Sequence, residues 1–162
     1  MKVLISDHLS DSAISIFKNK GIDVDYLPEI SRQRLKKIIH NYDALAIRSN
    51  TNVDKEILLL SSNLKVIGRA GIGVDNIDID SATSKGIIVM NTPHGNSITT
   101  AEHTIAMIMS LARQIPDANV STKNGNSAKW KFVGTEITAK KPGLIGCGNI
   151  GSIVVDRQKA LK

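Results

Sequence analysis

The sequence predicts an α/β fold, in which parallel strands are interleaved with helices. Along roughly the first 90 residues, short apolar runs alternate regularly with segments of helical periodicity. The apolar residues are mainly Ile, Val, Leu and Ala, whereas aromatic residues make up only 3% of the chain. This composition suits closely packed strands and helices, and the regular alternation indicates parallel strands with helices on both faces of the sheet.

Five strands and four helices are predicted in this first part of the chain. The strands are the apolar runs at residues 3–6, 24–27, 44–47, 65–68 and 87–90. Each helix is expected to begin at a side chain whose oxygen accepts a hydrogen bond from a free backbone N–H. The expected capping residues are Ser10 or Asp11, Ser31, Asn52 or Asp54, and Asp78 or Asp80. Gly21 and Gly86 end the first and the last of these helices.

The pattern changes after residue 95, and we place a boundary there between two domains, 1–95 and 96–162. The segment 97–114 lacks Pro and Gly and is apolar nearly all round, so it predicts a helix that a second domain, a second subunit or both bury. Pro116 ends this helix and starts a short one. A polar connector at 123–141 then leads to a predicted strand at 142–145 and a predicted helix at 149–161.

The composition narrows the classes of function. The net charge of +6 comes from dispersed Lys and Arg, which favours a solvated basic surface that attracts anionic metabolites over a nucleic-acid interface. A single cysteine, Cys147, forms no internal disulfide and fits the reducing cytoplasm. No apolar stretch reaches the ~18 residues of a membrane span, Asp7 comes too early for a signal peptide, and no metal-ligand spacing is present.

A glycine-rich run, LIGCGNIG at residues 144–151, is typical of a strand that turns into a helix at a dinucleotide-binding site. Gly146 allows the tight bend, Gly148 lets the backbone approach a pyrophosphate, and Gly151 lets the helix pack against the strand. The free N–H groups and the dipole at the start of the helix would hold the phosphates. The alternative is a tight turn that binds no ligand. The acidic residue that separates NAD from NADP is expected ~20 positions further on, beyond Lys162, so both cofactors stay open.

A second glycine cluster, GRAGIGVDN at residues 68–76, follows a predicted strand and so lies at the carboxyl edge of the sheet, where open α/β sheets bind ligands. Its backbone N–H groups suit a carboxylate or a phosphate. Arg48 and Ser49 follow the preceding strand and should reach the same edge, where a guanidinium and a hydroxyl would bind such an anion. The alternative is that Arg48 is a surface residue and Ser49 a helix cap.

None of the four histidines has the surroundings expected of a general base, which is most often a histidine held by a carboxylate. His8 and His40 lie in a loop or at a helix end, and His103 is more typical of a hydrogen-bonded packing residue on its helix. His94 lies in the loop that faces the expected cleft. The sequence therefore predicts no catalytic residue and no metal site.

Five segments occur in a characteristic order and at characteristic separations: RS at 48–49, VIGRAGIGVDNID at 66–78, NTPHGNSITTAEHT at 91–104, KWKFVGTEI at 129–137 and GLIGCGNIG at 143–151. Together they resemble the D-isomer-specific 2-hydroxyacid dehydrogenase family, and most of all its branch that oxidises 3-phosphoglycerate in serine biosynthesis. The resemblance covers essentially the whole chain. It implies a flavodoxin-like substrate-binding domain followed by the truncated start of a Rossmann domain that binds NAD.

The resemblance also implies roles for individual residues. Side chains that would bind the phosphate or hydroxyl end of the substrate are those of Arg48, Ser49 and Asn96, assisted by Arg69. The backbone that would hold the substrate carboxylate is that of Gly71, Ile72 and Gly73. The residues that would bind the pyrophosphate of NAD are Gly146, Gly148, Asn149, Ile150 and Gly151. The helix at 97–114 would pair two copies of the chain into a homodimer.

The chain departs from the family in what it lacks. The catalytic arginine, glutamate and histidine of the family, and its ribose-binding acid, are expected downstream of Lys162. The resemblance therefore implies cytoplasmic, NAD-linked oxidation of a small anionic 2-hydroxy acid, whereas the chain by itself is expected to be inactive. One alternative is a non-catalytic truncated remnant that binds anions or dimerises. Another is a dehydrogenase of the glyoxylate, glycerate or lactate type.

Overall fold

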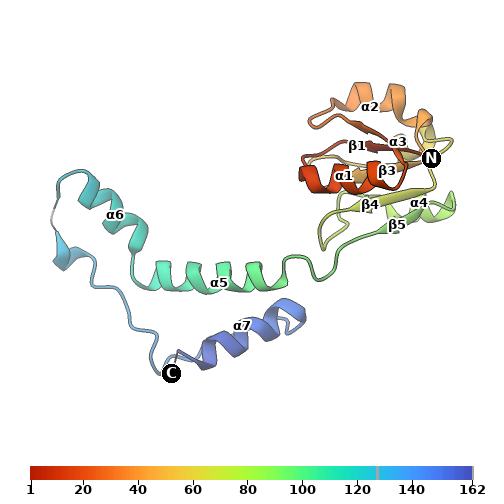
Figure 1. The fold of residues 1–162 in the computed structure, drawn as a ribbon. Helices are drawn as coiled ribbons and strands as arrows, with labels where there is room; N and C mark the ends of the chain where they lie inside the picture. Colours follow the sequence, from red (N-terminus) through yellow and green to blue (C-terminus); the bar gives the residue numbers. More distant parts are fainter. Residues whose placement is uncertain (127, 162) are drawn as a thin grey trace. The chain divides into compact units, whose positions relative to one another are not determined.

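The structure, a computed structural model, describes residues 1–126 and 128–161 (Figure 1). The chain divides into two compact units, Met1–Gly95 and Asn96–Lys162. The first unit contains a β-sheet with its helices, and the described residues of the second unit form helices and loops only. Residue 127, in the predicted connector, lies outside the described residues.

Five parallel strands form the sheet of the first unit (Figure 1). They are β1 (Lys2–Ile5), β2 (Asp23–Tyr26), β3 (Ala44–Ile47), β4 (Val66–Arg69) and β5 (Ile88–Met90). Their spatial order, β2-β1-β3-β4-β5, is the flavodoxin-like order, in which strand progression reverses between β1 and β3. The predicted parallel α/β fold is confirmed, and each predicted strand lies within one residue of an observed one.

Four α-helices connect these strands, and polar side chains cap three of them. The helices are α1 (Asp11–Asn19), α2 (Arg32–Ile38), α3 (Lys55–Leu60) and α4 (Ile79–Ser84), with the 3-10 helix η1 (Ile39–Asn41) after α2. The caps are the predicted Ser31, Asp54 and Asp78, whose side-chain oxygens accept hydrogen bonds of 2.9–3.3 Å from the backbone N–H three residues further on. Ser10, an expected cap of α1, makes no such bond.

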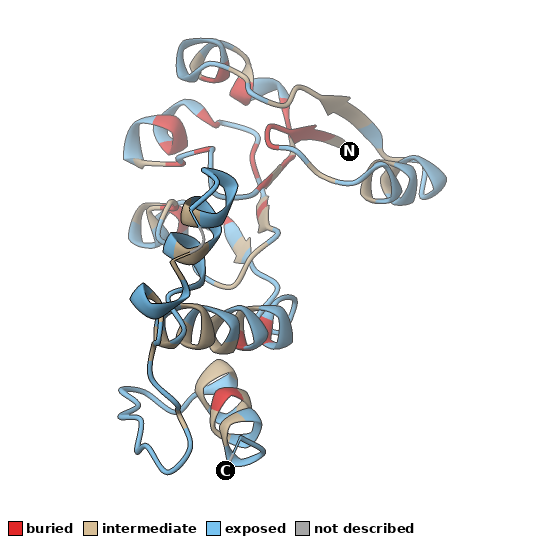
Figure 2. Cartoon of the chain, turned by 90° about the vertical axis from the view of Figure 1, so that its left-hand side faces the viewer, coloured by how far each residue is buried: buried red, intermediate tan, exposed pale blue. Residues whose placement is uncertain are grey.

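The core of the first unit lies on both faces of the sheet, because successive side chains of a strand point to opposite faces. Val3 and Ile5 of β1 are buried on one face, where Phe17 of α1 packs against them. Leu4 and Leu45 are buried on the other face among residues of α2, α3 and α4. Figure 2 shows buried residues, in red, on both the strands and the helices of the first unit.

β5 forms one edge of the sheet, and no further strand pairs with it among the described residues. The side chains of Ile88 and Met90 point to the same face of β5 and are 62% and 58% exposed. Val89, between them, packs against the core on the opposite face. The last strand therefore combines an open backbone edge with an exposed apolar face.

The second unit contains α5 (Ser97–Ala112), α6 (Ile115–Lys123), the 3-10 helix η2 (Lys129–Lys131) and α7 (Asn149–Lys159). α7 packs along α5 (Figure 1), and Nη2 of Arg157 lies 3.2 Å from Oε1 of Glu102. Pro116 stands in the first turn of α6, where its fixed φ suits the start of a helix.

α5 is less buried than its sequence predicts. Ile98 and Met107 are each 58% exposed and Leu111 is 82% exposed, although helices with so few polar residues are normally covered on several sides. Within the described residues, this apolar surface of α5 is therefore uncovered.

The prediction of a strand at residues 142–145 is wrong. The structure assigns no strand to this segment, and Leu144 and Ile145 are 45% and 105% exposed. An extended segment becomes a strand only when its backbone N–H and C=O groups pair with a neighbouring strand. The described part of the second unit contains no such neighbour, so only the helical half of the expected strand–helix unit, α7, is formed.

Candidate functional site

Two of the predicted anion-binding segments leave the carboxyl edge of the sheet side by side. β3 and β4 stay in register up to their last residues, Ile47 and Arg69, and the N–H of Ala70 donates to the Ile47 carbonyl at 2.8 Å. The pair Arg48–Ser49 and residues 70–76 of the glycine cluster, which follow β4, therefore begin next to each other. The first unit thus brings these two segments to one edge of the sheet.

Asp7, which follows β1, holds the backbone of the turn from Arg48 to Thr51. Its Oδ2 accepts hydrogen bonds from the N–H groups of Arg48 (2.6 Å) and Thr51 (3.2 Å), and its Oδ1 accepts one from the Thr51 hydroxyl (2.7 Å). The Ser6 hydroxyl lies 2.8 Å from the same Thr51 oxygen. Asp7 is only 3% exposed, so these bonds take the place of water around a buried carboxylate.

Asn76, the last residue of the glycine cluster, holds the same turn by hydrogen bonds to the carbonyl groups of the turn. Nδ2 of Asn76 donates to the carbonyl oxygens of Arg48 (2.8 Å) and Thr51 (2.6 Å). The backbone N–H of Val53 donates to the Asn76 carbonyl at 2.8 Å, which joins the two segments a second time. Oδ1 of Asn76 is buried and has no hydrogen-bond partner in the part of the chain that the structure describes.

The side chains of Arg48 and Ser49 are exposed at this edge. Within residues 1–126 and 128–161, neither the guanidinium nor the hydroxyl makes a hydrogen bond or an ion pair with another side chain. Ser49 is not a helix cap, because Asp54 caps α3. Both groups are therefore free to bind an anion, and the guanidinium offers the planar fork that fits a phosphate or carboxylate.

Neighbouring residues hold the glycine cluster by donating hydrogen bonds to its backbone carbonyl oxygens. Two backbone N–H groups of the cluster remain free. The Thr92 N–H donates to the Gly71 carbonyl at 2.9 Å, and Asn91 Nδ2 donates to the Ile72 carbonyl at 2.7 Å. The N–H groups of Ile72 and Gly73 have no hydrogen-bond partner among the described residues. Successive free N–H groups of this kind suit an anion such as a carboxylate.

The side chain of Arg69 contacts the later residues of the glycine cluster, to which Arg69 itself belongs. Its guanidinium donates to the Gly73 carbonyl and lies 3.7 Å from Oδ1 of Asp75, and its side chain is only 11% exposed. A Cβ atom on Gly71 would come within 2.8 Å of the same guanidinium. Arg69 therefore supports the loop from inside, in a position unlike that of the exposed Arg48.

Asn96 belongs to the second unit. It is the residue before α5, and its carbonyl accepts the N–H of Thr100 at 2.8 Å. Its exposed side chain makes no capping hydrogen bond. The predicted joint action of Asn96 and Arg48 on one substrate stays a prediction.

The glycine turn at 146–151 leads into α7, and its three glycines differ in their surroundings. Gly146 has a φ of +88°, a conformation that favours glycine. A Cβ atom on Gly151 would lie 2.5 Å from the Gly146 carbonyl oxygen, so Gly151 allows the turn to close against the helix. Nothing lies within 4 Å of a Cβ atom built on Gly148, which leaves the backbone at the start of α7 open to a ligand.

One histidine, His8, lies beside a carboxylate in the first unit. Nε2 of His8 lies 3.1 Å from Oε1 of Glu29, and the Tyr26 hydroxyl lies 3.5 Å from Nδ1 of His8. The side chains of His8 and Glu29 are 59% and 78% exposed, so water competes for both groups and the pair is weakly oriented. Glu29 has a left-handed φ of 64°, which is uncommon outside glycine.

Other candidate sites carry little chemistry. Among residues 1–126 and 128–161, no three His, Cys, Asp or Glu side chains are placed to hold a metal ion, and Cys147 is exposed. No described helix has both the length and the apolar character needed to cross a bilayer.

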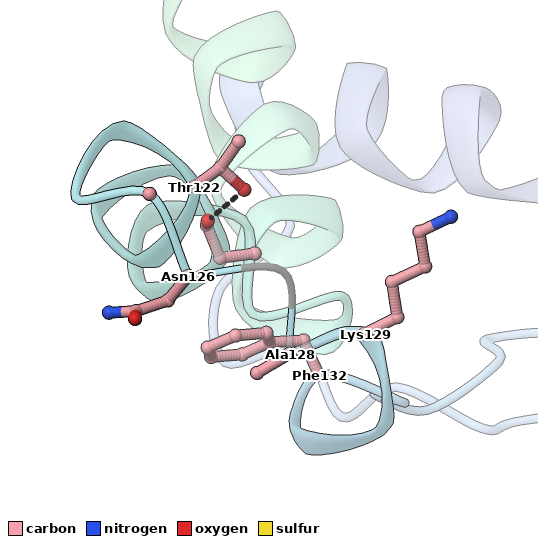
Figure 3. A pocket seen from close by; sticks show the side chains of 7 residues that line it. Thr122, Asn126, Ala128, Lys129 and Phe132 are labelled. Atoms are coloured by element: carbon pink, nitrogen blue, oxygen red, sulfur yellow. Dashed lines mark hydrogen bonds between the residues drawn. The ribbon is translucent and has the colours of Figure 1, made fainter.

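Figure 3 shows a hollow between α6 and η2, where the amide of Asn126 and the ammonium of Lys129 point in different directions. Polar groups that do not converge favour no particular ligand.

The family profile described as D-isomer specific 2-hydroxyacid dehydrogenase, catalytic domain, matches residues 3–155. The chain belongs to this family, and the resemblance inferred from its motifs is confirmed. Curated relatives at 42–46% identity are D-3-phosphoglycerate dehydrogenases. The one from Archaeoglobus fulgidus is 46% identical over 162 residues, which are 100% of this chain and 31% of the relative. The chain thus spans less than a third of the length of that relative.

Solved structures match nearly the whole chain. The NAD-dependent formate dehydrogenase from Staphylococcus aureus, in complex with NAD, has a TM-score of 0.89 at 21% identity, over 99% of this chain and 54% of the other; it shows the fold alone. An acyclic imino acid reductase in complex with NADPH and D-Arg has a TM-score of 0.86 at 27% identity, over 99% of this chain and 53% of the other. Both neighbours were solved with a nicotinamide cofactor.

Proposed function

We propose that the chain forms the substrate-binding domain and the start of the nicotinamide-binding domain of an NAD-dependent D-3-phosphoglycerate dehydrogenase. The observation that carries the proposal is the pairing of two anion sites at one sheet edge. Arg48 and Ser49 present a free guanidinium and hydroxyl, and Ile72 and Gly73 present free N–H groups. 3-Phosphoglycerate carries a phosphate at one end and a carboxylate at the other. The identity of 46% to a D-3-phosphoglycerate dehydrogenase supports the same substrate.

In this proposal the residues of the first unit bind and orient the substrate. The guanidinium of Arg48 and the hydroxyl of Ser49 hold the phosphate, and the N–H groups of the glycine cluster hold the carboxylate. The role of Asn96 in substrate binding rests on the family resemblance alone. Arg69 assists by keeping the free N–H groups of the loop at the surface.

The second unit binds the cofactor in this proposal. The backbone at the start of α7, formed by Gly148, Asn149, Ile150 and Gly151 after the bend at Gly146, holds the pyrophosphate. The open space over Gly148 fits a phosphate in contact with the backbone. We assign NAD as this cofactor, and the same turn would accept NADP. NAD, when bound, accepts the hydride from the substrate carbon.

A binding assay tests the substrate assignment. Calorimetric titration of the chain with D-3-phosphoglycerate should show saturable binding that is tighter than for glycerate, lactate or glyoxylate, which lack the phosphate. Arg48→Ala should weaken this binding at least tenfold, because the phosphate loses a charge-assisted pair of hydrogen bonds. Arg34→Ala, which removes an exposed guanidinium from α2, is the matched control and should leave the affinity unchanged. Equal affinities for all four acids would refute the assignment.

A second candidate function is binding without turnover. The described residues of the second unit form no sheet, and the histidine–carboxylate pair of the first unit is exposed. The 162-residue chain, mixed with NAD and D-3-phosphoglycerate, should therefore produce no NADH above background. NADH formation that depends on Arg48 would contradict this candidate and favour a complete catalytic site.

We also infer that two copies of the chain pair through α5, in the cytoplasm. Ile98, Met107 and Leu111 are exposed on this helix, and a second copy would cover them. Analytical ultracentrifugation should show a dimer, and Leu111→Glu should shift it to a monomer. A monomer at all concentrations of the unmodified chain would overturn this inference.

A further inference from the structure

We propose that Asp7 and Asn76 are positioning residues for the anion site at the sheet edge, because together they fix the turn that presents Arg48 and Ser49. The proposal rests on the proposed function for the identity of the bound anion, D-3-phosphoglycerate. Its geometric part concerns only hydrogen bonds within the first unit. Neither residue is among those that the sequence motifs assign to the substrate.

Asp7 and Asn76 both bind the backbone of the turn at 48–51, Asp7 as an acceptor of hydrogen bonds and Asn76 as a donor. The carboxylate of Asp7 accepts the N–H groups of Arg48 and Thr51, and the amide of Asn76 donates to the carbonyl groups of Arg48 and Thr51. Arg48 and Thr51 are thus each bound through both backbone polar groups. Rotation of the turn would break several of these bonds at once, so the Cα positions of Arg48 and Ser49 are fixed while their side chains remain free.

Asn76 also links the two anion sites. It ends the glycine cluster that carries the free N–H groups of Ile72 and Gly73, and its amide reaches the turn that carries Arg48. The distance between the phosphate-binding and the carboxylate-binding groups therefore depends on Asn76. A ligand with anionic groups at both ends is sensitive to that distance, whereas a ligand with one anionic group is not.

The amide of Asn76 acts through its donors. Its Oδ1 is buried and has no partner among the described residues, whereas its Nδ2 makes two hydrogen bonds. Asn76→Asp keeps the shape of the side chain but places a carboxylate oxygen against two carbonyl oxygens. This substitution should open the turn without creating a cavity.

Asp7→Asn is the conservative variant at the other position. An asparagine oxygen can still accept the N–H groups of Arg48 and Thr51. Its NH₂ can donate to the Thr51 hydroxyl, which then donates to Ser6 instead, since the hydrogen bond between Ser6 and Thr51 allows either direction. Asp7→Asn should therefore preserve the turn, whereas Asp7→Ala should not.

Amide hydrogen exchange of the full chain tests the geometry without any ligand. The N–H groups of Arg48 and Thr51 should be protected in the unmodified chain and should exchange at least tenfold faster in Asn76→Asp, while that of Leu45 in β3 is unchanged. Asn63→Asp is the matched control, because Asn63 Nδ2 also donates to a backbone carbonyl, that of His40, at 2.7 Å. Unchanged exchange of Arg48 and Thr51 in Asn76→Asp would overturn the proposal.

Titration with D-3-phosphoglycerate, followed by NMR, tests the link to binding. Asn76→Asp should weaken binding about tenfold, and Asp7→Asn less than threefold. In an Arg48→Ala background, Asn76→Asp should have little further effect, because the two changes act on the same contact. An undiminished effect of Asn76→Asp in that background would overturn the positioning role. Absence of binding to the unmodified chain would instead reject the proposed function, and the exchange result would still decide the geometry.

Discussion

The glycines of the turn before α7 show how one residue type meets different physical needs. Gly151 cannot accept a side chain without meeting the Gly146 carbonyl at 2.5 Å, whereas a side chain on Gly148 would meet nothing within 4 Å. Gly148 also has a φ of −82°, which any residue adopts. Steric need therefore explains Gly151, whereas no contact of the described residues requires a glycine at position 148.

Gly151→Ala and Gly148→Ala should consequently act on different properties. Gly151→Ala should destabilise the packing of α7 by about 1–3 kcal/mol, through overpacking against backbone, although alanine is the better helix former. Gly148→Ala should leave stability nearly unchanged and weaken NAD binding. Hydrogen exchange of the α7 amides and calorimetric NAD titration measure the two effects. Equal loss of protection in both variants would contradict this assignment.

Tyr42 should ionise unusually late. It is 4% exposed, and its hydroxyl donates to Oδ2 of Asp25 at 2.7 Å. Burial, and then this hydrogen bond, raise the pKa of Tyr42 to about 12 from 10.0. Because the folded state retains the proton longer than the unfolded state, stability is present below pH 10 and falls as the pH rises toward 12. Alkaline titration of tyrosine absorbance should show a late step that Tyr42→Phe removes.

For individual residues, the sequence predicted the exposed side chains at the sheet edge better than the buried side chains that fix the backbone beneath them. Arg48 and Ser49 follow a strand and carry anion-binding chemistry, so their spacing predicted them. Asp7 also follows a strand, and this position was the one feature of the sequence that indicated a place for Asp7 at the same sheet edge. Asn76 could not be recognised, because its role depends on contact with the turn at 48–51, across neighbouring strands. Such contacts between loops leave no periodic trace in a sequence.

Among the secondary-structure elements, the α4 helix offers a test of capping. Asp78 Oδ1 accepts the Ser81 N–H at 2.9 Å, and Oδ2 accepts the Ser81 hydroxyl at 2.8 Å. Asp78→Ala should lower the Tm by a few degrees, because the first turn of α4 loses its cap. Asp80→Ala removes another carboxylate from the same first turn, without a capping bond, and is the control. Equal Tm values for the two variants would contradict the capping role.

The same cap gives α4 a pH dependence. The Ser81 N–H, and then its hydroxyl, hold the pKa of Asp78 below its usual value of 3.8. A folded pKa below the unfolded one means that the stabilisation is present above about pH 4 and is lost as the pH falls through the folded value. The difference in Tm between Asp78→Ala and the unmodified chain should therefore shrink in acid.

Local chemistry was sufficient to predict the elements of the first unit. Short apolar runs, three capping residues and two glycines located its strands and helices closely. The same reasoning failed at 142–145, where the apolar run was present but no neighbouring strand pairs with it in the described residues. A strand needs a neighbouring strand to form hydrogen bonds with its backbone N–H and C=O groups, whereas a helix forms these bonds within itself. For this reason α7 formed and the strand did not.

At the scale of the whole molecule, the first unit should fold without the second. Both hydrophobic clusters of the core consist of residues within 1–95. A polypeptide of residues 1–95 should therefore unfold cooperatively and keep the NMR spectrum that these residues have in the full chain. A broad, non-cooperative transition would show that the sheet depends on α5 or on the segments after it.

The open edge at β5 has a consequence for handling the protein at high concentration. Unpaired N–H and C=O groups beside exposed Ile88 and Met90 form a template onto which a strand of another molecule can add. Fibrils seeded at β5 should appear with a lag phase in thioflavin fluorescence. Ile88→Lys should lengthen that lag by placing a charge on the growing surface, while Ile98→Lys in α5 should not.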